Sequence, residues 1–375
     1  MKKIDAEHGA ICALENEFFG YFGWPSVARL DGSTLVAVAS GLRTAHVCPF
    51  GRTIISFSRD EGSTWTSPQV VNDSPLDDRD AGVIGRGNQK LLVSWFTTDT
   101  RPYFTQEHLD SFDAVTRRRW DQGMAKITDA NTARWQGAWV RTSEDGGETW
   151  NPVVRIPVTA PHGPIRLQSG DLLYFGKEFG KSRDDFTGGT GRVIAMQSND
   201  DGATWQELGE VPLCEGTHVE SYHEPHVVEL PSGKLIGVIR IQNFGGKAQL
   251  EDAGILNFSI MQTESEDGGR TWTTARPLGF HGSPPHILRH SSGVLVLSYG
   301  YRQEPYGERV ALSRDDGATW EHDFVLRDDG PDSDLGYPAS VELADGRVLT
   351  VYYQKPSRRE DKCAFLWSRW QLPAS

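Results

Sequence analysis

The chain has 375 residues, of which 37% are hydrophobic and 24% charged, and its formal net charge is −13 at pH 7. This composition is that of an ordinary globular protein, and the acidic excess argues against nucleic acid as a partner. Residues 1–18 lack the apolar stretch of a secretion signal, and no later segment is apolar enough to span a bilayer. We therefore expect a cytoplasmic protein without a membrane partner.

The first predicted element is a strand over residues 11–18, and six repeating units follow it along the chain. Each unit has a short apolar strand, a turn centred on glycine and a second apolar strand, which is typical of antiparallel sheets. The first strand and turn of the units span Pro25–Ser33, Asp80–Asn88, His162–Asp171, Pro225–Lys234, Pro285–Val294 and Pro338–Arg347. Recurrence of one unit along the whole chain predicts a repeat architecture.

Five of the units continue into one eight-residue pattern, Ser-x-Asp-x-Gly-x-Thr-Trp. The five copies span Ser58–Trp65, Ser143–Trp150, Ser198–Trp205, Ser265–Trp272 and Ser313–Trp320. Asp followed two residues later by Gly predicts a hairpin turn, because the carboxylate accepts backbone N–H groups and Gly supplies a positive φ. The Trp ring is large enough to fill the gap between neighbouring sheets. We therefore interpret these boxes as structural and their aspartates as non-catalytic.

Each unit with its hairpin has about four strands, the size of one propeller blade. The sequence thus predicts an all-β fold, a six-bladed β-propeller with four antiparallel strands per blade, as a single domain over residues 1–375. The sixth unit has no box. We expect a chain end to supply its outer strand, with residues 363–372 beside residues 11–18, because this pairing closes the ring and removes exposed edges.

The second unit contains an insertion at residues 98–131. Its apolar residues have helical spacing and no glycine occurs before Gly123, so the insertion is expected to be helical and to cover or flank one face. It contains three successive arginines, residues 117–119. We interpret them as a solvated helix face rather than as an anion contact.

Four cysteines, Cys12, Cys48, Cys214 and Cys363, show no metal-ligand spacing. We expect them to be free thiols, and neither a metal nor a cofactor is predicted.

The residues just before the inner strands are expected to line the mouth of the central channel, where loops from all blades converge. An acid, an arginine, a histidine, a glutamate and a tyrosine thus gather at one pocket. In the register of the repeat, these mouth residues are Trp24, Asp78, Pro161, Glu224, Pro284 and Tyr337, followed closely by Arg79, Asp80 and His162.

The boxes, the six units and two of these motifs resemble the sialidase (neuraminidase) superfamily over essentially the whole chain. In that family a glutamate before an inner strand polarises a catalytic tyrosine, and an arginine at the end of the next strand holds the substrate carboxylate. Glu224 and Arg240 match that motif at the same spacing, and Tyr337 within Gly336–Gly346 matches the motif of the nucleophile. The resemblance implies a second carboxylate-binding arginine in the fifth unit, either Arg302 or Arg309.

The chemistry of this pair can be stated without the resemblance. A phenol with a pKa near 10 is a poor nucleophile unless a carboxylate such as Glu224 takes its proton during attack. A neutral nucleophile suits an anomeric carbon that bears a carboxylate, because an aspartate would be repelled by that charge. Planar guanidinium groups such as that of Arg240 bind a carboxylate through two hydrogen bonds.

The first unit departs from the family pattern in two places. The family's Arg-Ile-Pro is replaced by Gly23-Trp24-Pro25, so the first arginine is missing, and the following loop contains no aspartate to act as acid/base. His46 is the ordinary proton donor of that loop. We expect Arg43, His46 and Trp24 to form a different pocket wall, with Trp24 as a surface on which a sugar stacks.

The second unit offers replacements for both missing groups. Arg79 is a candidate for the lost arginine, and Asp78 or Asp80 is a candidate general acid. The alternative is a charged turn in which these acids pair with Arg79. His162 is a candidate substrate contact or a polar loop residue.

The sequence therefore predicts an exo-acting retaining glycoside hydrolase that removes a terminal acidic sugar from a glycan or oligosaccharide. Sialic acid is the first candidate for this sugar, and related keto acids or a uronic acid are the other candidates. One alternative is a lyase or rhamnosidase-like enzyme of this fold that acts on uronate-containing glycans with His46 or His162 and Tyr337. Another is a propeller that binds glycans without catalysis.

Overall fold

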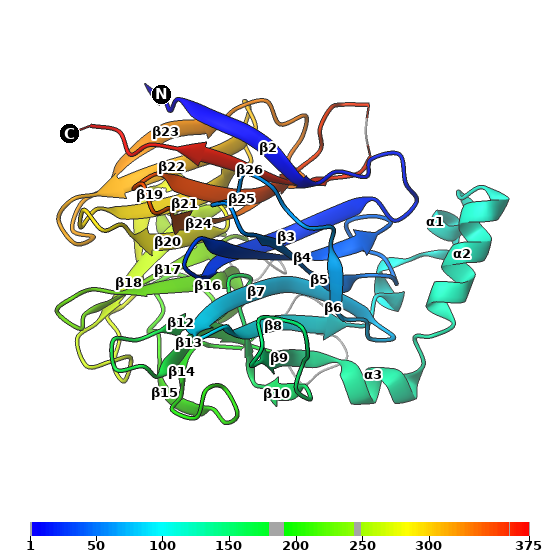
Figure 1. The fold of residues 1–375 in the computed structure, drawn as a ribbon, viewed down its shortest axis with the longest axis horizontal. Coiled ribbons are helices and arrows are strands. Elements are labelled where there is room, and N and C mark those ends of the chain that lie inside the picture. Colours follow the sequence, from blue (N-terminus) through cyan, green and yellow to red (C-terminus); the bar gives the residue numbers. More distant parts are fainter. Residues whose placement is uncertain (1, 180–190, 244–248, 360, 375) are drawn as a thin grey trace.

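The computed structural model describes residues 2–179, 191–243, 249–359 and 361–374. Six sheets surround a central axis, and their inner strands contact one another around the ring. The prediction of a six-bladed β-propeller with four antiparallel strands per blade is confirmed. The two chain ends lie near each other at one side of the molecule, and the helices project from the opposite side (Figure 1).

The first three blades contain the following strands. Blade 1 has β3 (Tyr21–Asp31), β4 (Thr34–Arg43), β5 (Arg52–Ser58) and β6 (Gln69–Asn72). Blade 2 has β7 (Asp77–Gly87), β8 (Lys90–Thr98), β9 (Gly137–Ser143) and β10 (Val154–Ile156). Blade 3 has β11 (Val158–Thr159), β12 (Ile165–Arg166), β13 (Leu172–Glu178), β14 (Val193–Ser198) and β15 (Gln206–Glu210).

The other three blades complete the ring. Blade 4 has β16 (Tyr222–Glu229), β17 (Leu235–Ile241), β18 (Ser259–Ser265) and β19 (Arg276–His281). Blade 5 has β20 (Pro285–Arg289), β21 (Leu295–Tyr301), β22 (Gly307–Ser313) and β23 (Glu321–Arg327), with β1 (Lys2–Lys3) added parallel to β23. Blade 6 has β24 (Leu335–Glu342), β25 (Val348–Gln354), β26 (Ala364–Trp370) and β2 (Ala6–Cys12).

The ring closes where the amino-terminal strand β2 pairs antiparallel with β26, as expected for the sixth blade. The predicted range of that strand, residues 11–18, is wrong, because β2 ends at Cys12. Phe18 and Phe19 instead pack edge to face on Phe50, which draws residues 13–20 out of the sheet and toward the insertion. All four cysteines are free.

The five boxes form the same turn between the third and fourth strands of blades 1 to 5. In the first, Asp60 accepts hydrogen bonds from the Thr64 backbone N–H at 2.8 Å and the Thr64 hydroxyl at 2.7 Å. The Gly62 N–H donates to the Ser58 hydroxyl at 2.8 Å. A Cβ on Gly62, whose φ is 81°, would lie 3.0 Å from Leu349 of blade 6. The boxes are therefore structural turns, and this one packs against the preceding blade.

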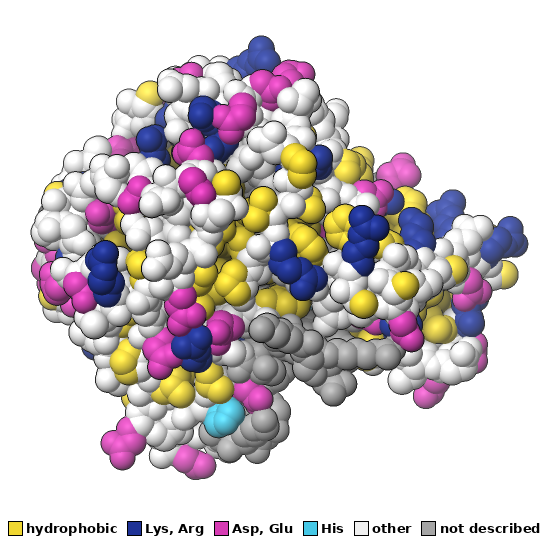
Figure 2. Space-filling view, turned by 90° about the horizontal axis from the view of Figure 1, so that it is seen from below, with side chains coloured by type: hydrophobic (Ala, Val, Ile, Leu, Met, Phe, Trp, Pro, Cys, Tyr) yellow, Lys and Arg dark blue, Asp and Glu magenta, His cyan; other side chains and the backbone are white. Residues whose placement is uncertain are grey.

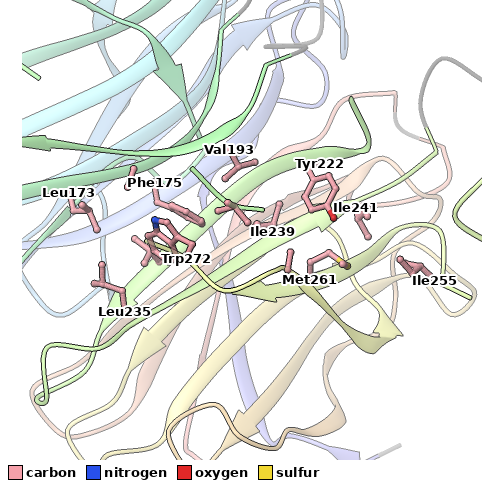
Figure 3. Packing of buried hydrophobic residues seen from close by; sticks show 14 of the residues in the cluster. Leu173, Phe175, Val193, Tyr222, Leu235, Ile239, Ile241, Ile255, Met261 and Trp272 are labelled. Carbon is pink, nitrogen blue, oxygen red and sulfur yellow. The ribbon is translucent and has the colours of Figure 1, made fainter. Parts of the chain in front are cut away.

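Apolar side chains fill the space between neighbouring sheets. Figure 3 shows the cluster between blades 3 and 4, where the box residue Trp272 stacks on Phe175 with 4.6 Å between ring centroids. The Trp ring thus joins two blades, as predicted from its size.

The insertion of blade 2 is helical and lies between β8 and β9. It contains η1 (Arg101–Tyr103), α1 (Gln106–Asp110), α2 (Ala114–Met124) and α3 (Asp129–Trp135), and so continues beyond the predicted residue 131. Two further 3-10 turns, η2 (Val219–Ser221) and η3 (Leu250–Ala253), lie in blade 4. No helix within the described ranges is long and apolar enough to cross a membrane.

Charged side chains of both signs are interspersed over the face in Figure 2. In the arginine run, Arg117 pairs with Asp110 and Asp121 at 2.8 Å each, and the Arg119 guanidinium lies 4.4 Å from the Phe18 ring centroid. Two of the three arginines therefore have partners within the chain, while Arg118 is exposed.

Candidate active site

The inner strands of blades 1, 2, 4 and 6 each contain a register shift, and a residue at that shift has a left-handed backbone. These residues are Trp24 (φ 51°), Asp80 (φ 53°), Glu224 (φ 35°) and Tyr337 (φ 53°). Such conformations cost about 1–3 kcal/mol each and cluster at functional sites. The sequence register placed Asp78 in this set, and the structure places Asp80 there instead.

Tyr337, Glu224 and Arg240 form a hydrogen-bonded group. The Tyr337 hydroxyl donates to Glu224 Oε1, and Arg240 Nη1 donates to Glu224 Oε2 at 2.6 Å and to the Tyr337 oxygen at 3.2 Å. Burial and the charges of Glu224 and Asp80 raise the pKa of Tyr337 well above its usual value. The phenol therefore keeps its proton at rest and directs it at the carboxylate that can accept it.

Asp80 lies beside this group in a small pocket. Burial raises the pKa of Asp80 to about 7, although the nearby Arg79 opposes the change. Because Asp80 is only 7% exposed, it belongs to the floor of the pocket. The residues that line this pocket are Asp80, Phe96, Thr159, Ala160, Pro161, Lys177, His223 and Glu224.

The structure distinguishes the two arginines of blade 5. The Arg302 guanidinium lies 5.8 Å from the Tyr337 ring centroid, and its Nη2 donates to the Leu335 carbonyl at 3.0 Å. Arg309 is 1% exposed and donates to the backbone carbonyls of Glu308, Arg327 and Pro305. Arg302, rather than Arg309, is therefore the blade-five arginine beside Tyr337.

Arg79 is also near the group, since the charges of Arg79 and Arg240 both act on Asp80. Its guanidinium lies 4.0 Å from the Trp24 ring centroid, and its Nη1 donates to the His46 carbonyl at 3.1 Å. Its Nη1 also lies 3.4 Å from Asp77 Oδ2, so Arg79 pairs with an acid of its own turn, as in the alternative drawn from the sequence, and 13% of its side chain is exposed.

Two other predicted site residues are fully buried and held by structural contacts. Arg43 binds both oxygens of Asp77, at 2.5 and 2.8 Å. Asp78 accepts four hydrogen bonds, from the Ser74 N–H and hydroxyl, the Thr97 hydroxyl and the Asn72 amide. Burial raises the pKa of Asp78 to about 6. Neither side chain has an atom free for a substrate, so the expectations for Arg43 and for Asp78 as general acid are corrected.

Trp24 is 1% exposed, which contradicts the expectation that a sugar stacks on it. Two guanidinium groups pack against the ring, with Arg79 and Arg43 4.0 and 4.8 Å from its centroid. The ring also contacts Tyr337 and His46, with centroids 6.3 and 5.0 Å apart. Trp24 is thus a buried ring that packs between Tyr337 and His46.

His46 has a partner that the sequence reading missed. Its Nδ1 lies 2.8 Å from Asp334 Oδ1, and the Tyr21 hydroxyl donates to both oxygens of Asp334 at 3.0 Å. Burial opposes ionisation of Asp334, but these hydrogen bonds hold its pKa at about 2. The one available signal was an acid three residues before Tyr337.

His162 is 2% exposed and lines an axial cavity of about 340 Å³ rather than the pocket beside Glu224. It packs on His226 and His286, with ring centroids 5.5 and 5.0 Å apart. Burial lowers the pKa of all three histidines, to about 3 for His226. Within the part of the chain that the structure describes, no group of three His, Cys, Asp or Glu side chains is placed to hold a metal ion.

Comparison with known proteins gives a consistent fold. The family of BNR repeat-like domains matches residues 124–351. A sialidase from Micromonospora viridifaciens is 24% identical over 349 residues, which cover 90% of this chain and 50% of that protein. The chain thus spans about half the length of this curated relative.

Three solved structures illustrate the likeness. A protein of unknown function from Dyadobacter fermentans has a TM-score of 0.73 at 22% identity, with 98% of each chain covered. Trypanosoma rangeli sialidase in complex with sialic acid has a TM-score of 0.62 at 18% identity, covering 98% of this chain and 60% of that one. The intramolecular trans-sialidase from Ruminococcus gnavus has a TM-score of 0.62 at 15% identity, covering 95% of each chain. Together these show a sialidase-like propeller of BNR repeats.

Proposed function

This chain belongs to the family of BNR repeat-like domains, and on that premise we propose that it is an exo-acting retaining glycoside hydrolase that releases a terminal acidic sugar. The observation that carries the proposal is the hydrogen bond from the Tyr337 hydroxyl to Glu224, with Arg240 bound to both. A tyrosine that points its proton at a carboxylate is an activated nucleophile.

The charges around Tyr337 support an anionic sugar as substrate. Arg240, Arg302 and Arg79 lie around the nucleophile in a chain whose formal net charge is −13. Guanidinium groups bind carboxylates through paired hydrogen bonds and so fix the orientation of the sugar. Arg240, whose Nε and Nη2 donate to Gln242 Oε1, would exchange this amide oxygen for the substrate carboxylate. The substrate class proposed is a terminal sialic acid or a related keto or uronic acid.

In the proposed reaction Tyr337 attacks the anomeric carbon while Glu224 takes the phenolic proton. Water then attacks the anomeric carbon of the covalent glycosyl-tyrosine opposite the Tyr337 bond, from the face that the leaving group left, and the two inversions give overall retention. Arg240, already bonded to both residues, stabilises the carboxylate and phenolate charges as the proton moves.

The test is release of 4-methylumbelliferone from a panel of acidic aryl glycosides. The wild-type protein is expected to cleave at least one of them, and Tyr337→Phe and Glu224→Gln to lose on the order of 10³-fold or more in kcat/KM. Tyr352→Phe is the matched control, because Tyr352 is a fully buried tyrosine of the same blade whose hydroxyl accepts from Arg327 at 3.0 Å.

Other outcomes would contradict the proposal. Glycan binding without turnover on every substrate would indicate a binding propeller, and new ultraviolet absorbance from an unsaturated uronate would indicate a lyase. Equal activities of the wild type and Tyr337→Phe would remove the tyrosine from the mechanism.

A further inference from the structure

We propose that His46, oriented by Asp334, is the acid/base of this site: it protonates the leaving oxygen and then takes a proton from the attacking water. The inference rests on the hydrolase proposed above and assigns the proton donor which that proposal leaves open.

The first support is the orientation of the imidazole. Nδ1 of His46 is 2.8 Å from Asp334 Oδ1, and the Tyr21 hydroxyl donates to both oxygens of the same carboxylate. An ionised carboxylate selects the tautomer whose Nδ1 bears the proton. Nε2 is therefore the atom available for reaction, and among the described residues none makes a hydrogen bond to it.

The second support is a clamped backbone. Arg43 Nη2 and Arg79 Nη1 both donate to the His46 carbonyl, at 2.9 and 3.1 Å. Further along the same loop, Phe50 packs edge to face on Trp120 of α2 with centroids 6.1 Å apart. A catalytic group works best when its surroundings fix it before the substrate arrives.

The third support is the exposed position of His46 beside the Trp24 ring that also contacts Tyr337. Its ring and that of Tyr337 both contact Trp24, with centroids 5.0 and 6.3 Å away. The His46 side chain is 45% exposed, whereas Asp80 is 7% exposed. In an exo-acting enzyme the leaving group carries the rest of the glycan and must stay outside. The exposed His46 side chain is open to an oxygen on that side, whereas the buried Asp80 carboxyl is not.

The proton transfers balance in two steps. In the first, the bond from Tyr337 oxygen to the anomeric carbon forms as the phenolic proton passes to Glu224. The bond to the leaving oxygen breaks with its electron pair, and that oxygen takes the proton from His46 Nε2. In the second, water gives a proton to Nε2 and its oxygen bonds to the anomeric carbon. The bond to Tyr337 breaks, and Tyr337 recovers its proton from Glu224.

The groups that face His46 set the pH dependence. Burial lowers the pKa of His46, Asp334 raises it, and Arg79 and Arg43 lower it further, while Tyr21 contacts it as a neutral phenol. The acid form is the imidazolium, so the glycosylation step is expected to slow as pH rises through the lowered pKa of His46.

The experiment compares two leaving groups on the same sugar, for example 4-methylumbelliferyl α-sialoside and sialyl-lactose. A phenolic leaving group needs little protonation, whereas a sugar alcohol needs it fully. His46→Gln is expected to lower kcat/KM for the oligosaccharide by about 10²–10⁴-fold and for the aryl glycoside by less than about 10-fold. Azide should raise turnover of the aryl glycoside by this variant and yield a glycosyl azide.

Asp334 is a positioning residue, and Asp334→Asn has its own readout. Without the carboxylate the imidazolium is less stable, so the alkaline limb of the kcat/KM profile should move to lower pH. His322→Gln is the matched control, because His322 is 43% exposed and lies 3.2 Å from Asp323 on the outer strand of blade 5. It should leave both substrates and the profile unchanged.

Three results would overturn the assignment. Equal losses of His46→Gln on both substrates, or no loss, would exclude His46 as the acid while the hydrolase stands. If instead Asp80→Asn lowers kcat/KM much more for the oligosaccharide than for the aryl glycoside, Asp80 is the acid. A wild-type protein that cleaves no acidic glycoside would overturn the hydrolase and this inference together.

Discussion

Arg43 and Asp77 form an ion pair in which both side chains have no exposure to solvent. The guanidinium also donates to the Ser40 hydroxyl at 2.8 Å and to the His46 carbonyl, so it joins β4, β7 and the loop between β4 and β5. Breaking a buried pair from one side leaves an uncompensated charge, which is more damaging than removing both partners.

We expect Arg43→Leu to lower the free energy of unfolding by about 3–5 kcal/mol, because Asp77 stays buried and loses its main partner. The double variant Arg43→Leu/Asp77→Leu should recover part of this loss. Urea unfolding of the two variants gives the comparison. If Arg43→Leu were as stable as the wild type, Arg79, whose Nη1 lies 3.4 Å from Asp77 Oδ2, would be a sufficient partner for that carboxylate.

At the scale of single residues, the sequence predicted those site residues that fall in a repeated register or in a motif of fixed spacing. Glu224 and Tyr337 were predicted from the register of the repeat and from the family motifs, and Arg240 from the family motif alone; the structure brings the three together. Asp334 was missed because its partner His46 lies 288 positions away, and nothing local marks the pair. Asp78 was aligned at the channel mouth in place of Asp80, because an alignment without gaps cannot show the register shift in β7.

Among the elements, the helical insertion of blade 2 has a clear mechanical link to the site. Trp120 of α2 is 3% exposed and packs with Cys48 and Phe50 of the loop that carries His46. Gly123 comes so close to this loop that a Cβ would lie 2.5 Å from the Phe50 ring. The insertion is therefore a buttress for one wall of the pocket.

Trp120→Ala should lower stability by about 3–5 kcal/mol as a large buried side chain is removed. If the insertion holds the His46 loop, kcat/KM should also fall more for an oligosaccharide than for an aryl glycoside. Val115→Ala on the same helix is the control, because Val115 is 57% exposed. Loss of stability with the ratio of the two activities unchanged would restrict the insertion to a structural role.

The strand count and the insertion were predictable because both rest on hydrophobic periodicity and turn residues repeated many times. The amino-terminal strand was misplaced by several residues because a single short copy carries no such repetition. The strand ends earlier than predicted because Phe18 and Phe19 pack on Phe50, which belongs to another blade.

For the whole molecule, three buried histidines on the propeller axis predict sensitivity to acid. Burial lowers the pKa of His162, His226 and His286, so they are neutral in the folded protein, whereas the unfolded chain binds protons below about pH 6.5. Stability should therefore be fully present above that pH and fall below it, by up to about 2 kcal/mol per histidine at pH 5.

Urea unfolding at pH 7.5 and pH 5 measures this difference. His226 and His286 stack with 4.3 Å between ring centroids, and replacing both (His226→Gln, His286→Gln) should reduce the pH dependence even if overall stability falls. An unchanged slope in the double variant would show that other groups control the response to acid.

The pairing of β2 with β26 has a consequence for how the protein is made. Tyr21 and His46 come from the first blade and Asp334 and Tyr337 from the sixth, so the reactive centre unites segments that leave the ribosome far apart in time. Early blades can fold as they emerge, since domains form from the amino terminus onward. We expect the proposed acid and nucleophile to come together in one event, when β26 has emerged and pairs with β2.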